Sequence, residues 1–306
     1  MSRTLPEISP QLRQKIERID ANRLKNYPPS DCIRLLDASP DRLSYSYVHP
    51  KVAAVLEAAG ERGHPLSSEY HKLLLLELIA HHEARIAASD LPASIKSWYA
   101  RNYVRIADDA AQDRQSPAFY HFRNDKYLKD LGVCSGRIIP AGAQKLNRYN
   151  LPLGALRHAG PGALVKAAMR VARMGGWGPV YDMHTDSHDP DLMSEFSPEG
   201  WRKFYLNVAE LLQVQSDVRG LFGIGWFFDP QVAEISPRLA YLRDLVHESG
   251  GRIFKVGANE GARESALATS PTRRKLHEEG RYVPTDYMAL WDRRSLMRWA
   301  RGQRPA

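Results

Sequence analysis

Two short apolar runs separated by an amphipathic segment set the strongest limit on how this chain folds. Residues 178–183 and 219–228 are each long enough for a buried strand, and residues 198–214 between them carry apolar side chains at helical spacing. This order of strand, helix and strand predicts an α/β fold. Ligands in open α/β sheets bind where the strands end. The residues that follow each run are therefore the first place to look for a functional site.

The rest of the chain divides into a helical part and a mixed part. Residues 1–115 have helical periodicity, including a leucine-rich segment at 73–79 that is too long for an edge strand. Further strands are expected at 127–134, 135–139, 251–256 and 287–290, and further helices at 163–174, 237–247 and 271–279. We therefore predict a helical region over 1–115 and an α/β (α+β) domain over 116–306, with a mixed sheet flanked by helices, and we expect this second domain to be catalytic.

Three serine–proline pairs predict helix starts, at residues 197, 236 and 270. The serine hydroxyl accepts a hydrogen bond from an unpaired backbone N–H, and proline suits the first position of a helix.

Composition limits the class of protein. The chain has 306 residues, of which 43% are hydrophobic and 25% are charged, as in a globular protein with a large core. It has neither a membrane-length apolar run nor an N-terminal secretory pattern, and its two cysteines, Cys32 and Cys134, predict a reducing cytoplasm. The net charge of +8 favours anionic partners, although a basic surface by itself also fits solubility. We expect a small-molecule substrate, with neither membrane nor nucleic acid as the main partner.

A polar segment rich in histidine and aspartate follows the first apolar run. In an extended chain Asp182, His184, Asp186 and His188 point to the same side. One histidine is then a candidate general base, oriented by a neighbouring aspartate. The alternative is a polar loop that only leaves the sheet, since Asp189 precedes a proline.

The same segment also permits a metal site. His184, Asp186 and His188 supply two imidazoles and a carboxylate, a set that binds iron, zinc or manganese, although the spacing matches no specific zinc signature. A second pair, Glu77 and His81, shares a helix face. That pair suits either a metal or a polar stripe on a half-buried helix.

The second apolar run ends in aromatic residues and an acid. Trp226 and Phe228 are candidates for the wall of a substrate pocket, and Asp229 follows them at the expected strand end. If the two strands are neighbours, Asp229 lies beside His184. The alternative is an ordinary aromatic core closed by a turn.

A third candidate combines hydroxyls, a helix start and two arginines. Thr272, Arg273 and Arg274 follow the serine–proline pair at 270, an assembly that can bind a phosphate or carboxylate. The alternative is a capped helix with solvated arginines. The basic tail at 293–304 suits either nucleic acid or a solvated helix.

The order of elements resembles the central part of the GNAT N-acyltransferase fold. It runs through the strands and helices expected at 178–183, 198–214, 219–228, 237–247 and 251–256. The resemblance implies that acyl-CoA lies in a splay between the first two strands, with its pyrophosphate at the helix start near Ser197. The phosphate-loop pattern of Arg or Gln followed by Gly-x-Gly is missing. Four carboxylates stand there instead, and they repel a pyrophosphate: Asp189, Asp191, Glu195 and Glu199.

Our leading hypothesis is acyl transfer from acyl-CoA, or another acyl donor, to an amine or amino acid. His184 is then the base, Asp186 orients it or binds substrate, Asp229 recognises the amine, and Arg273 and Arg274 contact anions. Two alternatives stay open. One is a hydrolase or oxygenase with a divalent metal on the His184, Asp186 and His188 cluster. The other is a non-enzymatic binding protein with a basic C-terminus.

Overall fold

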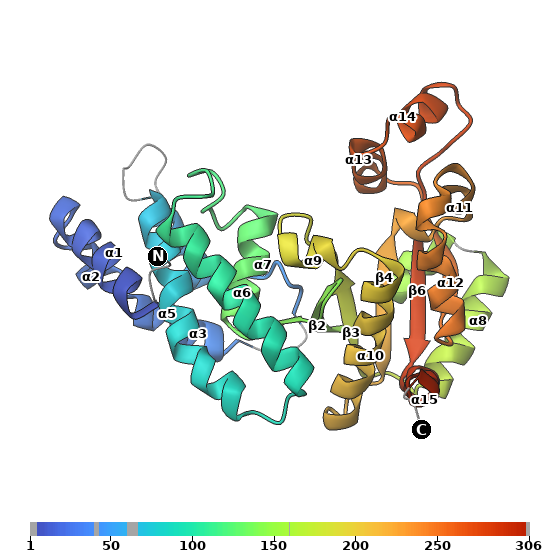
Figure 1. Cartoon of the computed structure of the whole chain (residues 1–306), viewed down its shortest axis with the longest axis horizontal. Coiled ribbons are helices and arrows are strands. Elements are labelled where there is room, and N and C mark those ends of the chain that lie inside the picture. The colour runs from blue at the N-terminus through green and yellow to red at the C-terminus, as the bar shows by residue number, and fades with distance from the viewer. Residues whose placement is uncertain (1–4, 40–42, 60–66, 159, 304–306) are drawn as a thin grey trace. The chain divides into compact units, whose positions relative to one another are not determined.

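The computed structural model describes residues 5–39, 43–59, 67–158 and 160–303 (Figure 1). The chain contacts divide it into two units, Met1–Ala141 and Gly142–Ala306. The helical part thus extends past residue 115 to Cys134. No helix among the described residues has the length and apolar character needed to cross a bilayer.

The first unit is built around one long buried helix. Its elements are α1 (Leu5–Ile19), α2 (Arg23–Asn26), α3 (Pro29–Asp37), α4 (Pro50–Ala59), α5 (Ser67–Ala88), α6 (Ala93–Ala111), α7 (Asp125–Cys134) and β1 (Ile138–Pro140). Helix α5 packs against α1, α3, α6 and α7. This explains its apolar run, because a helix covered on several sides carries apolar residues all round.

The expected strand at 127–134 is wrong, because these residues form α7. The side chain of Asn124 accepts hydrogen bonds from the backbone N–H groups of Lys126 and Tyr127, at 2.9 and 3.4 Å. This N-cap favours a helix, and Leu128 and Leu131 then share its buried face. The stretch expected as a strand at 135–139 contributes only the short β1.

The second unit contains a mixed sheet with strand order β2-β3-β4-β6-β5. Its elements are β2 (Lys145–Asn150), η1 (Leu153–His158), α8 (Pro161–Arg173), β3 (Pro179–His184), α9 (Pro190–Ser194), α10 (Pro198–Val214), β4 (Gly220–Gly225), η2 (Trp226–Phe228), α11 (Pro230–Ile235), η3 (Pro237–Leu239), α12 (Tyr241–Glu248), β5 (Arg252–Gly257), α13 (Glu260–Ala268), α14 (Pro271–Glu278), β6 (Asp286–Asp292) and α15 (Arg293–Gln303). The chain therefore has a mixed α/β fold, as the sequence predicted.

Helices cover both faces of this sheet (Figure 1). On one face α8 packs against a core that contains Phe222, Phe254 and Leu290. On the other face the ring of Trp291 lies 5.1 Å from that of Tyr205 on α10, and α10 also packs against α12 and α15. Because neighbouring residues of a strand point to opposite faces, the continuous apolar runs reflect burial on both sides.

The pairing of β3 with β4 is short. Their parallel ladder joins two residue pairs, Tyr181 with Leu221 and Asp182 with Phe222. The antiparallel ladder between β4 and β6 joins six. Beyond Asp182 and Phe222, β3 and β4 form no further ladder pair with each other in the described chain, although each continues to pair with its other neighbour, β2 or β6.

Two expected boundaries change in this unit. The strand expected over 219–228 ends at Gly225, and the three aromatic residues that follow form the 3-10 turn η2. Ser197 and Ser270 cap their helices as predicted, but the serine at 236 precedes only the short turn η3, and α12 begins at Tyr241.

Candidate functional site

Four polar side chains gather on one face of the sheet where β3 ends. The ladder of β2 with β3 pairs Lys145 with His184 and Asn147 with Asp182. Directly paired residues of an antiparallel ladder lie on the same face, and residues two apart on a strand share that face. All four therefore lie on the face that α8 covers, since Val180 of β3 belongs to the α8 core.

His184 is fixed by two neighbours. Its Nε2 lies 2.5 Å from Oδ1 of Asn147 and 3.4 Å from Oδ2 of Asp182. Since the amide oxygen can only accept, the Nε2–H donates to it, and the neutral ring carries its lone pair on Nδ1. Burial raises the pKa of Asp182 to about 8.

Asp186 has a different partner from the one expected. Lys145 donates from Nζ to Oδ2 of Asp186 at 2.6 Å and lies 3.2 Å from Oδ2 of Asp189, and all three side chains are buried. The strand ends at His184, and a backbone bond from the N–H of Asp189 to the carbonyl of Asp186 turns the chain. The side-to-side alternation therefore stops there. Asn147 and Asp182 contact His184, whereas Asp186 neutralises a buried lysine.

The structure gathers a possible metal-ligand group elsewhere. Among the described residues, three ligand atoms come within 4.8 Å of one another at Asp37, His81 and His82 in the first unit. His184, Asp186 and His188 form no such group. Burial lowers the pKa of His82 to about 4, which keeps this imidazole neutral. The guanidinium of Arg85 lies 3.8 Å from the carboxylate of Asp37, and its positive charge opposes a bound cation there.

Asp229 lies in a buried turn after β4. Its Oδ1 caps α11 by accepting from the N–H of Gln231 at 3.0 Å, and its Oδ2 is buried without a hydrogen bond within the described chain. Burial raises the pKa of Asp229, and the nearby cations Arg243 and Lys255 oppose this shift. Strands β3 and β4 are neighbours as the sequence expectation required, but η2 carries Asp229 past the strand end.

The aromatic residues Trp226 and Phe228 of η2 differ in burial. Phe228 is fully buried, with its ring 6.5 Å from that of Trp201. Trp226 is half-buried, and the guanidinium of Arg273 lies 4.5 Å above its ring.

The two neighbouring arginines on α14 also differ in burial. Arg273 is almost fully buried and bonds to the carbonyl of Ala266 at 2.6 Å and to the hydroxyls of Ser236 and Thr269. Its guanidinium thus ties α14 to the preceding helices. Thr272 and Arg274 on the same helix are exposed.

The helix start near Ser197 is acidic and already capped. The Ser197 hydroxyl accepts from the N–H of Gly200 at 3.1 Å. Glu195 comes before this cap, and Glu199 occupies the first turn of α10. A pyrophosphate at this end meets two carboxylates, as the sequence implied.

The C-terminal helix packs onto the fold. Helix α15 contacts α10, and the indole N–H of Trp299 donates to the carboxylate of Glu248 at 3.3 Å.

Sequence reasoning missed two residues of the predicted site and one buried tyrosine on α12. Lys145 and Asn147 lie on β2. The stretch 145–150 is mostly polar, and its hydrophobic pattern did not predict a strand. Tyr241 begins α12, and its hydroxyl is buried without a hydrogen bond in the described chain. Burial raises its pKa to about 12. Only strand pairing and helix packing reveal these positions.

The comparisons with known proteins find similar structures but no related sequence. No protein-family model matches the chain, and no curated protein matches it. A solved acyltransferase in complex with decanoyl-CoA is 12% identical, with a TM-score of 0.48 over 93% of this chain and 79% of that one. An acyltransferase in complex with decanoyl-CoA and teicoplanin is 12% identical, with a TM-score of 0.44 over 92% and 88%. An acyltransferase in complex with CoA and 10C-teicoplanin is 11% identical, with a TM-score of 0.43 over 94% and 80%. These values assign no activity to the chain.

Proposed function

We propose that this chain is a GNAT-like N-acyltransferase, which moves an acyl group from an acyl thioester such as acyl-CoA to the amine of a small molecule or amino acid. The observation that supports this proposal is the two-pair ladder between β3 and β4, with His184 at the end of β3. The GNAT resemblance implies a donor held in a splay between two such strands. A ladder that stops at Asp182 and Phe222 fits that requirement.

The proposed chemistry needs one base. Nδ1 of His184 accepts a proton from the incoming ammonium group, and the freed amine nitrogen attacks the thioester carbonyl carbon. A C–N bond forms, the C–S bond breaks, and the sulfur leaves as a thiolate that takes up a proton. Asn147 keeps the ring in the required tautomer through the bond to Nε2. We expect this positioning to matter nearly as much as the imidazole itself.

In this proposal Asp229 binds the acceptor amine. Its buried Oδ2 lacks a hydrogen bond in the described chain, and an ammonium group would supply one. Trp226 remains the proposed pocket wall, and the exposed Thr272 and Arg274 remain proposed substrate contacts. Phe228 and Arg273 support this region from within the core.

The proposal is tested with the purified chain, a panel of acyl-CoA donors and a panel of amines. Thiol release reports turnover, and mass spectrometry identifies the amide. His184→Gln should lower kcat by at least about 100-fold, the usual contribution of a positioned base. His247→Gln, at an exposed histidine on α12, is the matched control and should keep full activity.

A second variant tests amine binding separately from the chemical step. Asp229→Asn should mainly raise KM for the amine, because it removes the charge that recognises the ammonium group. The double variant of His184 and Asp229 should lose transfer and keep the melting temperature of the wild type. Turnover that survives in the double variant would remove this site from the reaction.

A further inference from the structure

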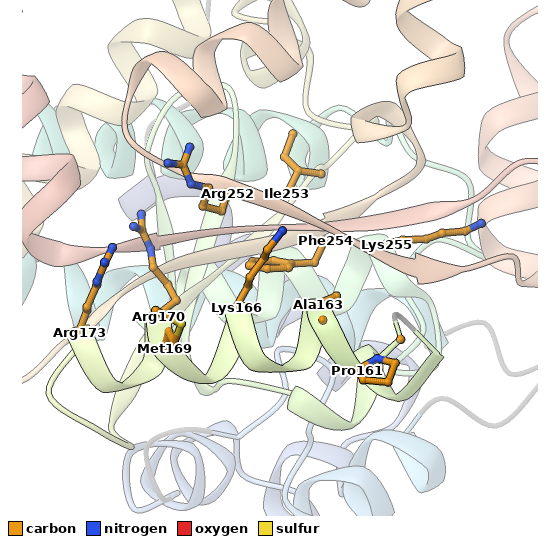
Figure 2. Close-up of a pocket in the computed structure, with 12 residues that line it drawn as sticks. Pro161, Ala163, Lys166, Met169, Arg170, Arg173, Arg252, Ile253, Phe254 and Lys255 are labelled. Atoms are coloured by element: carbon orange, nitrogen blue, oxygen red, sulfur yellow. The ribbon is translucent and has the colours of Figure 1, made fainter.

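A basic groove lies between α8 and β5, on the second unit's edge strand (Figure 2). Its volume is about 680 Å³, within the range of small-molecule sites. Five cationic side chains line it: Lys166, Arg170 and Arg173 from α8, and Arg252 and Lys255 from β5. Its lining contains no aspartate or glutamate among the described residues.

The positive charge in this groove is mostly uncompensated. Arg170 alone of the five has an ion pair in the described chain, with Nη1 2.9 Å from the carboxylate of Asp292. Burial lowers the pKa of Arg170, and the charges of Arg252 and Arg173 act in the same direction. Arg170 is more than nine-tenths buried, yet its Nε has no hydrogen bond in the described chain. Such mutual repulsion is relieved by an anion.

The N-terminus of α8 adds to the positive electrostatic potential of the groove. Its N-cap is Gly160, which has φ 82° and supplies no side-chain hydrogen bond. The first turn, including Gly162 and Ala163, lines the groove. Uncapped N–H groups at the positive end of a helix dipole favour phosphate or carboxylate. The groove thus combines backbone donors with the cationic side chains.

The arrangement of these groups indicates the class of ligand. In Figure 2, Arg173, Arg170 and Arg252 lie at one end of the groove, and Lys255 and Pro161 lie at the other. A ligand that satisfies both ends needs at least two anionic groups. Phe254 and Met169 add apolar surface to the lining. A nucleic acid fits less well, because α8 also exposes the apolar side chains of Leu164 and Val165.

We propose that this groove binds a phosphorylated small molecule through two or more phosphate groups. The phosphates come either from a soluble metabolite or from a lipid headgroup, since both present the same chemistry. The inference does not rest on acyl transfer. The lining of the groove includes neither His184 nor Asp229, although the charge of Lys255 also acts on Asp229.

The test measures binding of ADP and of inorganic triphosphate by titration calorimetry at fixed ionic strength without added metal. Lys166→Glu with Arg252→Glu reverses two groove charges. Arg294→Glu with Arg298→Glu makes the same charge change at exposed positions of α15 and is the matched control. The groove variant should bind at least about tenfold more weakly, a loss of about 1.4 kcal/mol. The control should bind like the wild type.

A vesicle arm distinguishes the two sources of phosphate. Sedimentation with phosphatidylcholine vesicles that contain phosphatidylinositol 4,5-bisphosphate tests the lipid headgroup. Binding of the soluble probes, lost in the groove variant, supports a metabolite, and binding of vesicles alone, lost in the same way, supports a lipid. Equal loss in both double variants, or no binding of any probe by the wild type, overturns the proposal. Circular dichroism on all variants excludes unfolding as the cause.

Discussion

The buried charge of Lys145 yields the sharpest prediction about this fold. Its ammonium group lies 2.6 Å from Asp186 and 3.2 Å from Asp189, and each of the three residues is at most 1% exposed. Lys145→Met keeps the length of the side chain and removes the charge. Two carboxylates then stay buried without their cation.

The expected loss is large. Removing one partner of a buried ion pair destabilises a protein by about 3–5 kcal/mol, or roughly 6–20 °C in Tm for a domain of about 150–250 residues. Changing Asp186 to Asn as well should recover part of this loss, because one uncompensated charge disappears. Lowering the pH should also reduce the difference between variant and wild type, since protonation neutralises the remaining carboxylates.

The assay is unfolding by urea and by heat, followed by circular dichroism and calorimetry. The two units are fitted as separate transitions where they unfold separately. Lys275→Met, at an exposed lysine of α14, is the matched control and should change stability by less than about 0.5 kcal/mol. If Lys145→Met were no more destabilising than this control, the buried triad would not contribute as described.

Three further predictions concern β3 and α10. The pKa of Asp182 is raised from 3.8 to about 8 in the folded chain, so the folded state holds the extra proton between these values and stability falls as pH rises through that window. Asp182→Asn should therefore be more stable than the wild type at pH 7, with a flatter pH dependence in urea titrations; an unchanged pH dependence would contradict this. Ser197→Ala should lower the free energy of unfolding by about 1 kcal/mol through loss of the cap, with Ser197→Thr as the conservative comparison. Gly200→Ala should destabilise by more than about 2 kcal/mol, because a Cβ there would lie 2.1 Å from the carbonyl oxygen of Glu195; a Tm equal to that of Gly302→Ala, where a Cβ meets open space, would argue against this contact.

Some of the candidate site was predictable and some was not. His184 stands where a strand ends, and an apolar run followed by a polar cluster is enough to predict that position. Its partners were not predictable, because Asn147 belongs to a polar strand whose pairing with β3 has no local signature. Asp186 was expected beside His184 from alternation. The chain turns after β3, so the side-to-side alternation of an extended strand ends there. Asp186 therefore pairs with Lys145 instead.

The sequence by itself determined where the main buried elements lie, since apolar periodicity and serine–proline caps act over a few neighbouring residues. It also determined the acidic character of the start of α10. The tertiary structure decided which strands pair, that the β3–β4 ladder stops after two pairs, and that the cations of α8 and β5 face one groove. These features depend on contacts between residues far apart in the chain. Local composition does not predict such contacts, because they form only when distant elements pack together.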